Sequence, residues 1–198
     1  MNHFNTKNIL TLTALSLGLV LSGCLTDSKD DDGGIAVADS LTTKLVTAGA
    51  QTNATYGSSI DIDNFMAYTI NQAETREQDI DLIFAFSTSI GGVPAVYSPD
   101  TAKYGIGTGN GFDFMADFEN PNTTVIKTVT VNFDSINTKE KLDSLWFVGQ
   151  TVTNGRQNIV TGTTFMAKSN LNKTVLIRVN NVTTGADGIA NFEGAAKF

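Results

Sequence analysis

From about residue 40 onward, apolar and polar side chains alternate along the chain with a period of two. The segment 79–86 shows this pattern best, because every second residue is apolar while Asp79 and Asp81 fall on the opposite face. Strict alternation of this kind predicts a β-strand with one face buried and the other in solvent. The predicted buried face of this strand carries Ile80, Leu82, Phe84 and Phe86.

The same alternation recurs in other segments, and turn residues separate these segments from one another. Asn154-Gly155 is the best hairpin signal, because both residues tolerate a positive φ. Residues 183–188 are predicted to form the turn between the last two strands. The segments predicted as strands are 43–48, 60–63, 65–70, 79–86, 94–98, 111–118, 125–133, 146–153, 157–160, 163–168, 174–179 and 188–194.

One segment predicts a helix. Asn137 can act as its N-cap, Glu140 lies three residues further on, and apolar residues follow at helical spacing up to Trp146. Short strands with turn signals about every ten residues favour two antiparallel sheets. We therefore predict an all-β domain over residues 39–198, an antiparallel β-sandwich or barrel-like sandwich with one short helix.

The first 23 residues have the pattern of an export signal. A polar start with Lys7 precedes an apolar run from Ile9 to Leu21, and the run is too short to span a membrane comfortably. The run ends in Leu21-Ser22-Gly23-Cys24, which resembles the lipobox of bacterial lipoproteins. The resemblance implies that Cys24 is acylated, becomes the mature N-terminus and anchors the chain to a membrane.

Residues 24–38 are predicted to form a lipidated, acidic and flexible tether, because they are polar and lack apolar periodicity. The run Lys29-Asp-Asp-Asp32 resembles the acidic tract that follows the lipidated cysteine in surface-exported lipoproteins of Bacteroidota-type envelopes. Leu25 follows the cysteine in place of the aspartate linked with inner-membrane retention. The resemblance thus implies an anchor in the outer membrane. It leaves two alternatives for the side on which the domain lies, extracellular or periplasmic.

Composition restricts the chemistry further. The chain has 198 residues, a net charge of −7, one cysteine and one histidine. An acidic surface repels phosphate backbones, so we predict no nucleic-acid partner. Removal of the signal takes away His3, and lipid consumes the Cys24 thiol. Nucleophilic triads, histidine zinc sites and histidine-ligated haem are then excluded, and we predict neither a cofactor nor an enzyme.

Aspartate pairs are the remaining catalytic material, because two carboxylates can supply the acid and the base of glycoside hydrolysis. Each pair is predicted on the solvent face of a strand, where it needs no function. The same residues could bind calcium if the fold gathered them, but the sequence shows no dedicated metal site. The pairs are Asp61 with Asp63, Asp79 with Asp81, and Asp113 with Asp117.

The residues Asp79-Ile-Asp-Leu-Ile-Phe84, followed by Gly91-Gly92, resemble a strand and glycine pair of the HmuY-like haem-capturing lipoproteins. That family ligates haem iron through histidines, which the predicted mature chain lacks. The resemblance therefore implies the fold and does not extend to haem.

Three aromatic residues, Tyr97, Tyr104 and Trp146, lie near glycine-rich or polar segments, where a ring could stack on a sugar. Trp146 also suits the core, because it follows apolar positions at helical spacing. We predict a non-enzymatic module that binds glycan or another envelope protein through loops at one end of the sandwich. The alternatives are a structural accessory subunit that uses a strand edge or a flat sheet face, and an aspartate-pair glycosidase.

Overall fold

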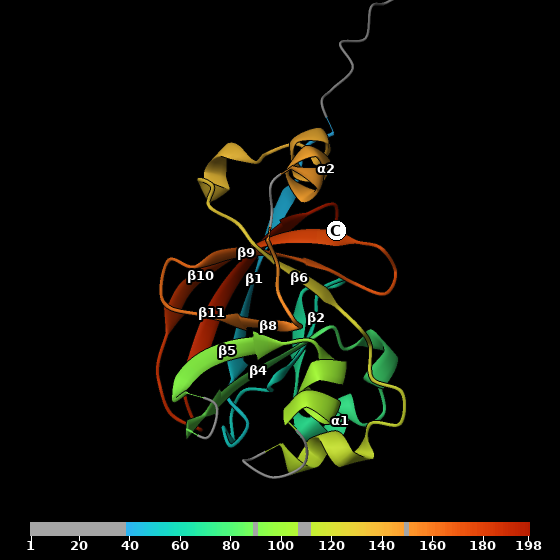
Figure 1. Cartoon of the computed structure of the whole chain (residues 1–198), viewed down its shortest axis with the longest axis vertical. Coiled ribbons are helices and arrows are strands. Elements are labelled where there is room, and N and C mark those ends of the chain that lie inside the picture. The colour runs from blue at the N-terminus through green and yellow to red at the C-terminus, as the bar shows by residue number, and fades with distance from the viewer. Residues whose placement is uncertain (1–38, 89–90, 107–111, 149–150) are drawn as a thin grey trace, which may run out of the picture. The chain divides into compact units, whose positions relative to one another are not determined.

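The computed structural model describes residues 39–88, 91–106, 112–148 and 151–198, which form two antiparallel sheets packed face to face (Figure 1). The predicted fold class, an all-β sandwich with one short helix, is confirmed. The predicted signal, the tether and Cys24 lie outside these residues. Within the part of the chain described, no helix is long and apolar enough to cross a membrane.

The larger sheet has six strands in the order β1-β11-β10-β9-β6-β7, and the smaller has five in the order β3-β2-β4-β5-β8. The six strands are β1 (Thr42–Gly49), β6 (Val125–Thr128), β7 (Thr151–Val152), β9 (Thr164–Lys168), β10 (Thr174–Val182) and β11 (Ile189–Ala196). The five strands are β2 (Ser59–Asp61), β3 (Met66–Tyr68), β4 (Leu82–Ser87), β5 (Val93–Tyr97) and β8 (Arg156–Asn158).

Helical segments lie between the strands. The two α-helices are α1 (Ile70–Ala73) and α2 (Lys139–Phe147), and Thr138 caps α2 by accepting a hydrogen bond from the Lys141 amide at 3.3 Å. The predicted helix is therefore confirmed, although its cap is one residue later than Asn137. The shorter segments are η1 (Glu77–Asp79), the π-helix η3 (Thr101–Ile106), η4 (Asp113–Asp117) and η5 (Phe133–Ser135).

The main core lies between the two sheets and follows the period-two pattern. Leu82 and Phe84 of β4 point inward, and the Phe84 ring meets Phe192 of β11 edge-on at a centroid distance of 5.9 Å. Each fully buried phenylalanine contributes about 2 to 3 kcal/mol to stability. A slip of one residue would turn these rings outward, so the aromatic residues define the strand register.

The outer faces of both sheets are covered as well. Leu142 and Trp146 of α2 pack with Met166 and Leu176 of the larger sheet. On the smaller sheet, Ile83 and Tyr97 pack against residues from η4 and its flanks, including Phe112 and Met115. The prediction that 79–86 forms a half-buried strand is therefore wrong, since β4 is buried on both faces.

Two predictions of strands are wrong, because apolar residues in these segments pack on the outer faces of the two sheets. Residues 112–118 form η4 and its flanks, and Phe112 packs on Tyr97 from outside the sheet. The predicted strand 125–133 ends at Thr128, and Phe133 belongs to η5 beneath α2. Alternating aromatic residues indicated burial in both cases, but not the conformation that achieves it.

One of the two turn predictions is confirmed and the other is wrong. Residues 183–188 join β10 to β11 as predicted. Gly155 has the predicted positive φ of 69°, but β7 before it pairs with β6 while β8 after it pairs with β5. Asn154-Gly155 thus carries the chain from one sheet to the other, and its assignment as a hairpin is wrong.

Candidate functional site

Of the two tyrosines in the predicted aromatic loop site, the structure buries Tyr97 and exposes Tyr104. Tyr97 is 1% exposed, its ring meets Phe112 edge-on at 5.7 Å, and burial raises the pKa of its hydroxyl. Tyr104, on η3, is 69% exposed. The expected exposure of Tyr97 is wrong because η4 and its flanks cover the outer face of β5.

Trp146 is a core residue. Trp146 lies on the face of α2 that packs against the larger sheet, together with Leu142 of α2 and Met166 of β9. The ammonium groups of Lys127 and Lys168 lie 4.3 and 5.6 Å from its ring centroid, respectively. A ring enclosed in this way cannot serve as a platform for a sugar.

Two of the six candidate aspartates are buried, contrary to prediction. Asp61 and Asp81 are each 1% exposed, whereas Asp79, Asp113 and Asp117 lie in solvent. The sequence contained one signal that this prediction missed. The face of 79–86 that carries Asp81 also carries the apolar Ile83 and Ala85, which indicates burial on both sides.

Strand pairing brings three of these carboxylates together. Asp61 ends β2, Asp63 lies in the turn to β3, and Asp81 directly precedes β4. Ile60 pairs with Leu82 in the antiparallel register, so Asp61 and Asp81 come opposite each other where the pairing ends. One carboxylate oxygen from each of the three residues lies within 4.8 Å of the others. We call Asp61, Asp63 and Asp81 the carboxylate triad.

Hydrogen bonds orient the two buried members of the carboxylate triad. Asp61 accepts from the backbone and side-chain amides of Asn64 at 2.8 and 2.9 Å, one on each oxygen. Oδ2 of Asp81 accepts from the Ile62 amide at 3.0 Å. Oδ1 of Asp81 is buried and has no hydrogen-bond partner among the described residues.

The third member, Asp63, is tied to the turn between β9 and β10. Its Oδ1 accepts from the Ser169 hydroxyl at 2.9 Å. The Lys173 ammonium donates to the backbone carbonyl of Asp63, not to its carboxylate. The carboxylate triad therefore joins three parts of the chain that are distant in sequence.

Burial dominates the electrostatics of the carboxylate triad. Burial raises the pKa of Asp81 to about 8, although its hydrogen bond from Ile62 acts in the opposite direction. Burial also raises the pKa of Asp63, against the lowering effect of Ser169, and lowers the pKa of Lys173. Asp81 is therefore protonated at neutral pH unless a cation lies beside it. The three side chains together offer oxygen ligands suited to a hard cation.

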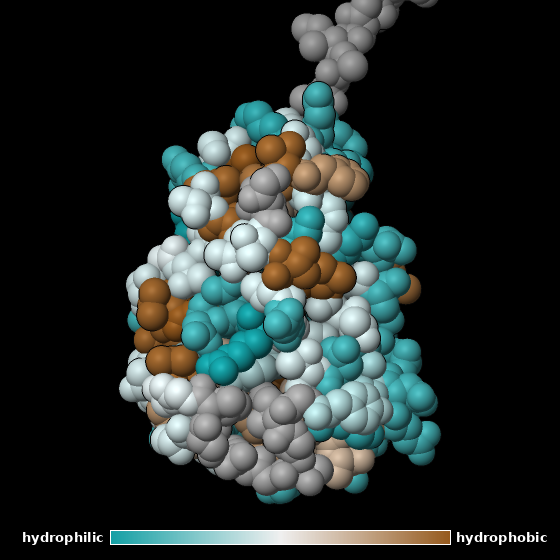
Figure 2. Space-filling model, in the orientation of Figure 1, coloured by the Kyte–Doolittle hydropathy of each residue, from teal (hydrophilic) through white to brown (hydrophobic). Residues whose placement is uncertain are grey.

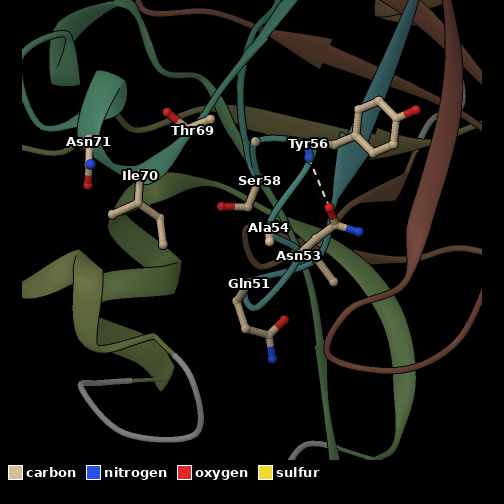
Figure 3. Close-up of a pocket in the computed structure, with 10 residues that line it drawn as sticks. Gln51, Asn53, Ala54, Tyr56, Ser58, Thr69, Ile70 and Asn71 are labelled. Carbon is tan, nitrogen blue, oxygen red and sulfur yellow. Dashed lines mark hydrogen bonds between the residues drawn. The ribbon is translucent and has the colours of Figure 1, made fainter.

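A separate polar pocket of about 310 Å³ opens where the loop after β1 meets the start of α1 (Figure 3). We call it the β1–α1 pocket. In Figure 3 the Ser58 hydroxyl and the Ile70 side chain point into the space between these segments, while the Tyr56 ring points away. Its lining residues are Ala50, Gln51, Asn53, Ala54, Tyr56, Gly57, Ser58, Thr69, Ile70 and Asn71.

Hydrogen bonds hold the wall of the β1–α1 pocket rigid. Gln51 pairs with the backbone of Phe86, whose amide donates to its Oε1 at 2.9 Å. Oδ1 of Asn53 accepts from the amide of Tyr56 at 2.9 Å, drawn as the dashed line in Figure 3. The hydroxyl of Ser58 is buried without a hydrogen-bond partner among the described residues, and Asn71 is exposed. The Ser58 hydroxyl is enclosed by protein, so Asn71 is the side chain that offers polar atoms at the mouth of this prearranged wall.

Comparison with known proteins gave no match: no family model, no curated protein and no solved structure is significantly similar to this chain. The lipoprotein and HmuY-like resemblances therefore stay predictions from sequence. What this protein does has to be inferred from its own residues.

Proposed function

We propose that the protein is a membrane-anchored lipoprotein of the cell envelope whose β-sandwich is a non-enzymatic module that binds glycan. The export signal and the sequence ending in Cys24 support the anchor. The β1–α1 pocket supports the binding role, and the observation that carries it is the cavity of about 310 Å³, lined by the exposed Asn71 and the half-buried Ile70. This pocket replaces the loop of Tyr97 and Tyr104 as the candidate contact surface.

Sugar chemistry suits the β1–α1 pocket. A sugar presents hydroxyls that donate and accept hydrogen bonds, together with apolar C–H surfaces. Asn71 supplies a polar partner at the surface, and Ile70 supplies apolar surface beside it. The wall is held in place by Gln51 and Asn53, so little conformational entropy is lost on binding.

The carboxylate triad gives little support to a glycosidase. An acid and a base must both reach a glycosidic bond, but Asp61 and Asp81 are almost fully buried. Of the exposed candidates, Asp79 pairs with Arg76 at 3.6 Å, and Asp117 lies on η4. The non-enzymatic proposal is therefore preferred.

A protein partner is the second candidate. The outer sheet faces that an accessory subunit could use are largely covered by helical segments. Exposed apolar side chains instead lie at the end of α2, where Phe147 and Val148 face solvent. Figure 2 shows apolar residues on the surface at the end of the domain where α2 lies. This surface favours a contact with another envelope protein in addition to glycan.

Binding of the full-length, detergent-solubilised protein to an array of bacterial glycans tests the main proposal. Asn71→Ala should weaken binding by roughly fivefold, because one neutral hydrogen bond contributes ~1 kcal/mol. Tyr104→Ala, which changes an exposed ring outside the pocket, should bind like the wild type. Absence of glycan binding, or binding that responds to Tyr104→Ala and not to Asn71→Ala, would contradict the proposal.

A further inference from the structure

We propose that the carboxylate triad of Asp61, Asp63 and Asp81 is a binding site for one calcium ion. Calcium takes oxygen ligands at about 2.3 to 2.6 Å, so two oxygens on one ion are separated by about 5 Å at most. The triad offers three carboxylate oxygens that all lie within 4.8 Å of one another. A single ion placed between them can lie within about 2.8 Å of all three, so shifts of a few tenths of an ångström bring them to bonding distance.

The unpartnered oxygen of Asp81 is the second observation. Oδ1 of Asp81 is buried without a hydrogen-bond partner among the described residues, and the side chain is 1% exposed. A buried polar atom that lacks a partner is costly, and proteins rarely keep one. A cation beside this oxygen replaces the missing partner.

The charge balance points the same way. None of the three carboxylates forms an ion pair within 4.0 Å with a lysine or arginine of the described residues. The ammonium groups beside the triad donate to backbone carbonyls: that of Lys173 to Asp63, and that of Lys44 to Asn64. Three acidic side chains thus converge without a cation in direct contact, a gap that a divalent ion fills.

The site is arranged in advance of binding. Asn64 orients Asp61, Ser169 orients Asp63, and the Ile62 amide orients Asp81. Each of these hydrogen bonds leaves lone pairs on the carboxylate for a metal. Orientation of ligands by neighbouring donors raises metal affinity, because less ordering is required on binding.

The donor set and its burial select calcium among the common metals. All three ligands are carboxylates, which suit hard cations and not the softer ions that prefer histidine or cysteine. Magnesium retains several waters and loses them reluctantly, but two of the three ligands here are almost fully buried. Calcium exchanges water for protein oxygens more readily.

Bound calcium would act as a structural clamp. It would hold the β2–β3 turn against the start of β4 and, through Ser169, against the β9–β10 turn. These segments belong to both sheets, so the ion would join the two sheets.

The test is calorimetric titration of calcium chloride into the full-length, chelator-treated protein, together with thermal unfolding. The wild type should bind one calcium per chain and unfold at a higher temperature with calcium than with a chelator, and magnesium chloride should bind at least tenfold more weakly. Asp81→Asn should weaken calcium binding at least tenfold. Asp117→Asn, at an exposed aspartate of η4, is the matched control and should bind like the wild type.

Wild type that neither binds calcium nor gains thermal stability at millimolar calcium overturns the proposal, and so does unchanged binding by Asp81→Asn. If Asp81→Asn does not fold, Asp63→Asn replaces it, because this side chain is only partly buried. A tenfold loss with Asp63→Asn supports the site, and unchanged binding overturns it. Neither result bears on the β1–α1 pocket, so the glycan proposal is tested independently.

Discussion

Asp61 and Asp81 are each 1% exposed, whereas Asp113 and Asp117 on η4 lie in solvent. Both sets lie beside apolar residues in the sequence, and both were predicted on solvent faces. The difference arises from strand pairing: the β2–β4 register places Asp61 opposite Asp81 beneath other parts of the chain. η4 and its flanks instead cover the smaller sheet with Phe112, Phe114 and Phe118 and leave Asp113 and Asp117 outside. The same type of side chain is thus a solubilising group at one position and a buried group at the other.

The largest expected consequence of this difference is a dependence of stability on pH. In a chelating buffer, Asp81 has a pKa of about 8 in the folded chain against 3.8 when unperturbed. Between these values the folded state binds more protons than the unfolded state, so stability falls as the pH rises, by at most about 1.4 kcal/mol per pH unit. The raised pKa of Asp63 acts with the same sign. Urea unfolding between pH 5 and pH 8 measures the slope.

Asp81→Asn supplies the comparison for this slope, because an amide does not titrate. The variant should lose most of the decline in stability, and Asp117→Asn should retain all of it. Equal slopes in the wild type and Asp81→Asn would show that Asp81 titrates normally.

The next largest effect is expected from alanine substitutions, which should lower the free energy of unfolding at Asp81 and leave it nearly unchanged at Asp117. Asp81→Ala leaves the Ile62 amide without its acceptor inside the protein and should lower the free energy of unfolding by about 2 to 3 kcal/mol. Asp117→Ala changes an exposed side chain and should stay within about 0.5 kcal/mol of the wild type. Chemical denaturation at pH 5 in a chelating buffer measures both. Similar losses in the two variants would remove the distinction between them.

A smaller loss of stability is expected from a substitution at Gly194, which lies against the Phe65 ring of the β2–β3 turn. Phe65 closes this turn with a positive φ of 57°, and its ring lies on Gly194 of β11. A Cβ at Gly194 would come within 2.3 Å of that ring. Gly194→Ala should therefore displace Phe65 and cost about 1 to 3 kcal/mol.

Gly162→Ala is the control for Gly194→Ala. Gly162 has a positive φ of 90° but open space around it, so alanine there should cost about 1 to 2 kcal/mol of backbone strain without displacing a neighbour. Thermal unfolding compares the two variants. A Gly194→Ala protein as stable as the wild type would show that the Phe65 ring moves aside freely.

Several features of the fold could be predicted because they depend on local pattern. Alternating residues predicted β9, β10 and β11, and the capping and apolar spacing near residue 140 predicted α2. The outer layers were missed for a physical reason. A face that carries both aspartates and apolar residues, as in 79–86, is ambiguous until another part of the chain is known to cover it.

The site was predicted less well than the fold. The ring of Tyr97 was expected to contact a ligand because it lies near a polar segment, but Tyr97 lies on β5, where Phe112 covers its ring. Asn71 attracted no attention, because one asparagine in a chain rich in polar residues has no distinctive pattern. Its place in a pocket appears only where the loop after β1 meets α1.

The sequence by itself determined the period of the strands, the antiparallel sandwich, the loss of imidazole chemistry that follows from the predicted processing, and the expectation of an anchor at Cys24. These depend on neighbours in the chain or on composition. Only the tertiary structure decided which outer sheet faces are covered by helical segments and where the β1–α1 pocket opens. It also decided that Asp63 meets Ser169, 106 residues away. Such contacts depend on strand register and on which segments cover each sheet, and both are properties of the packed molecule as a whole.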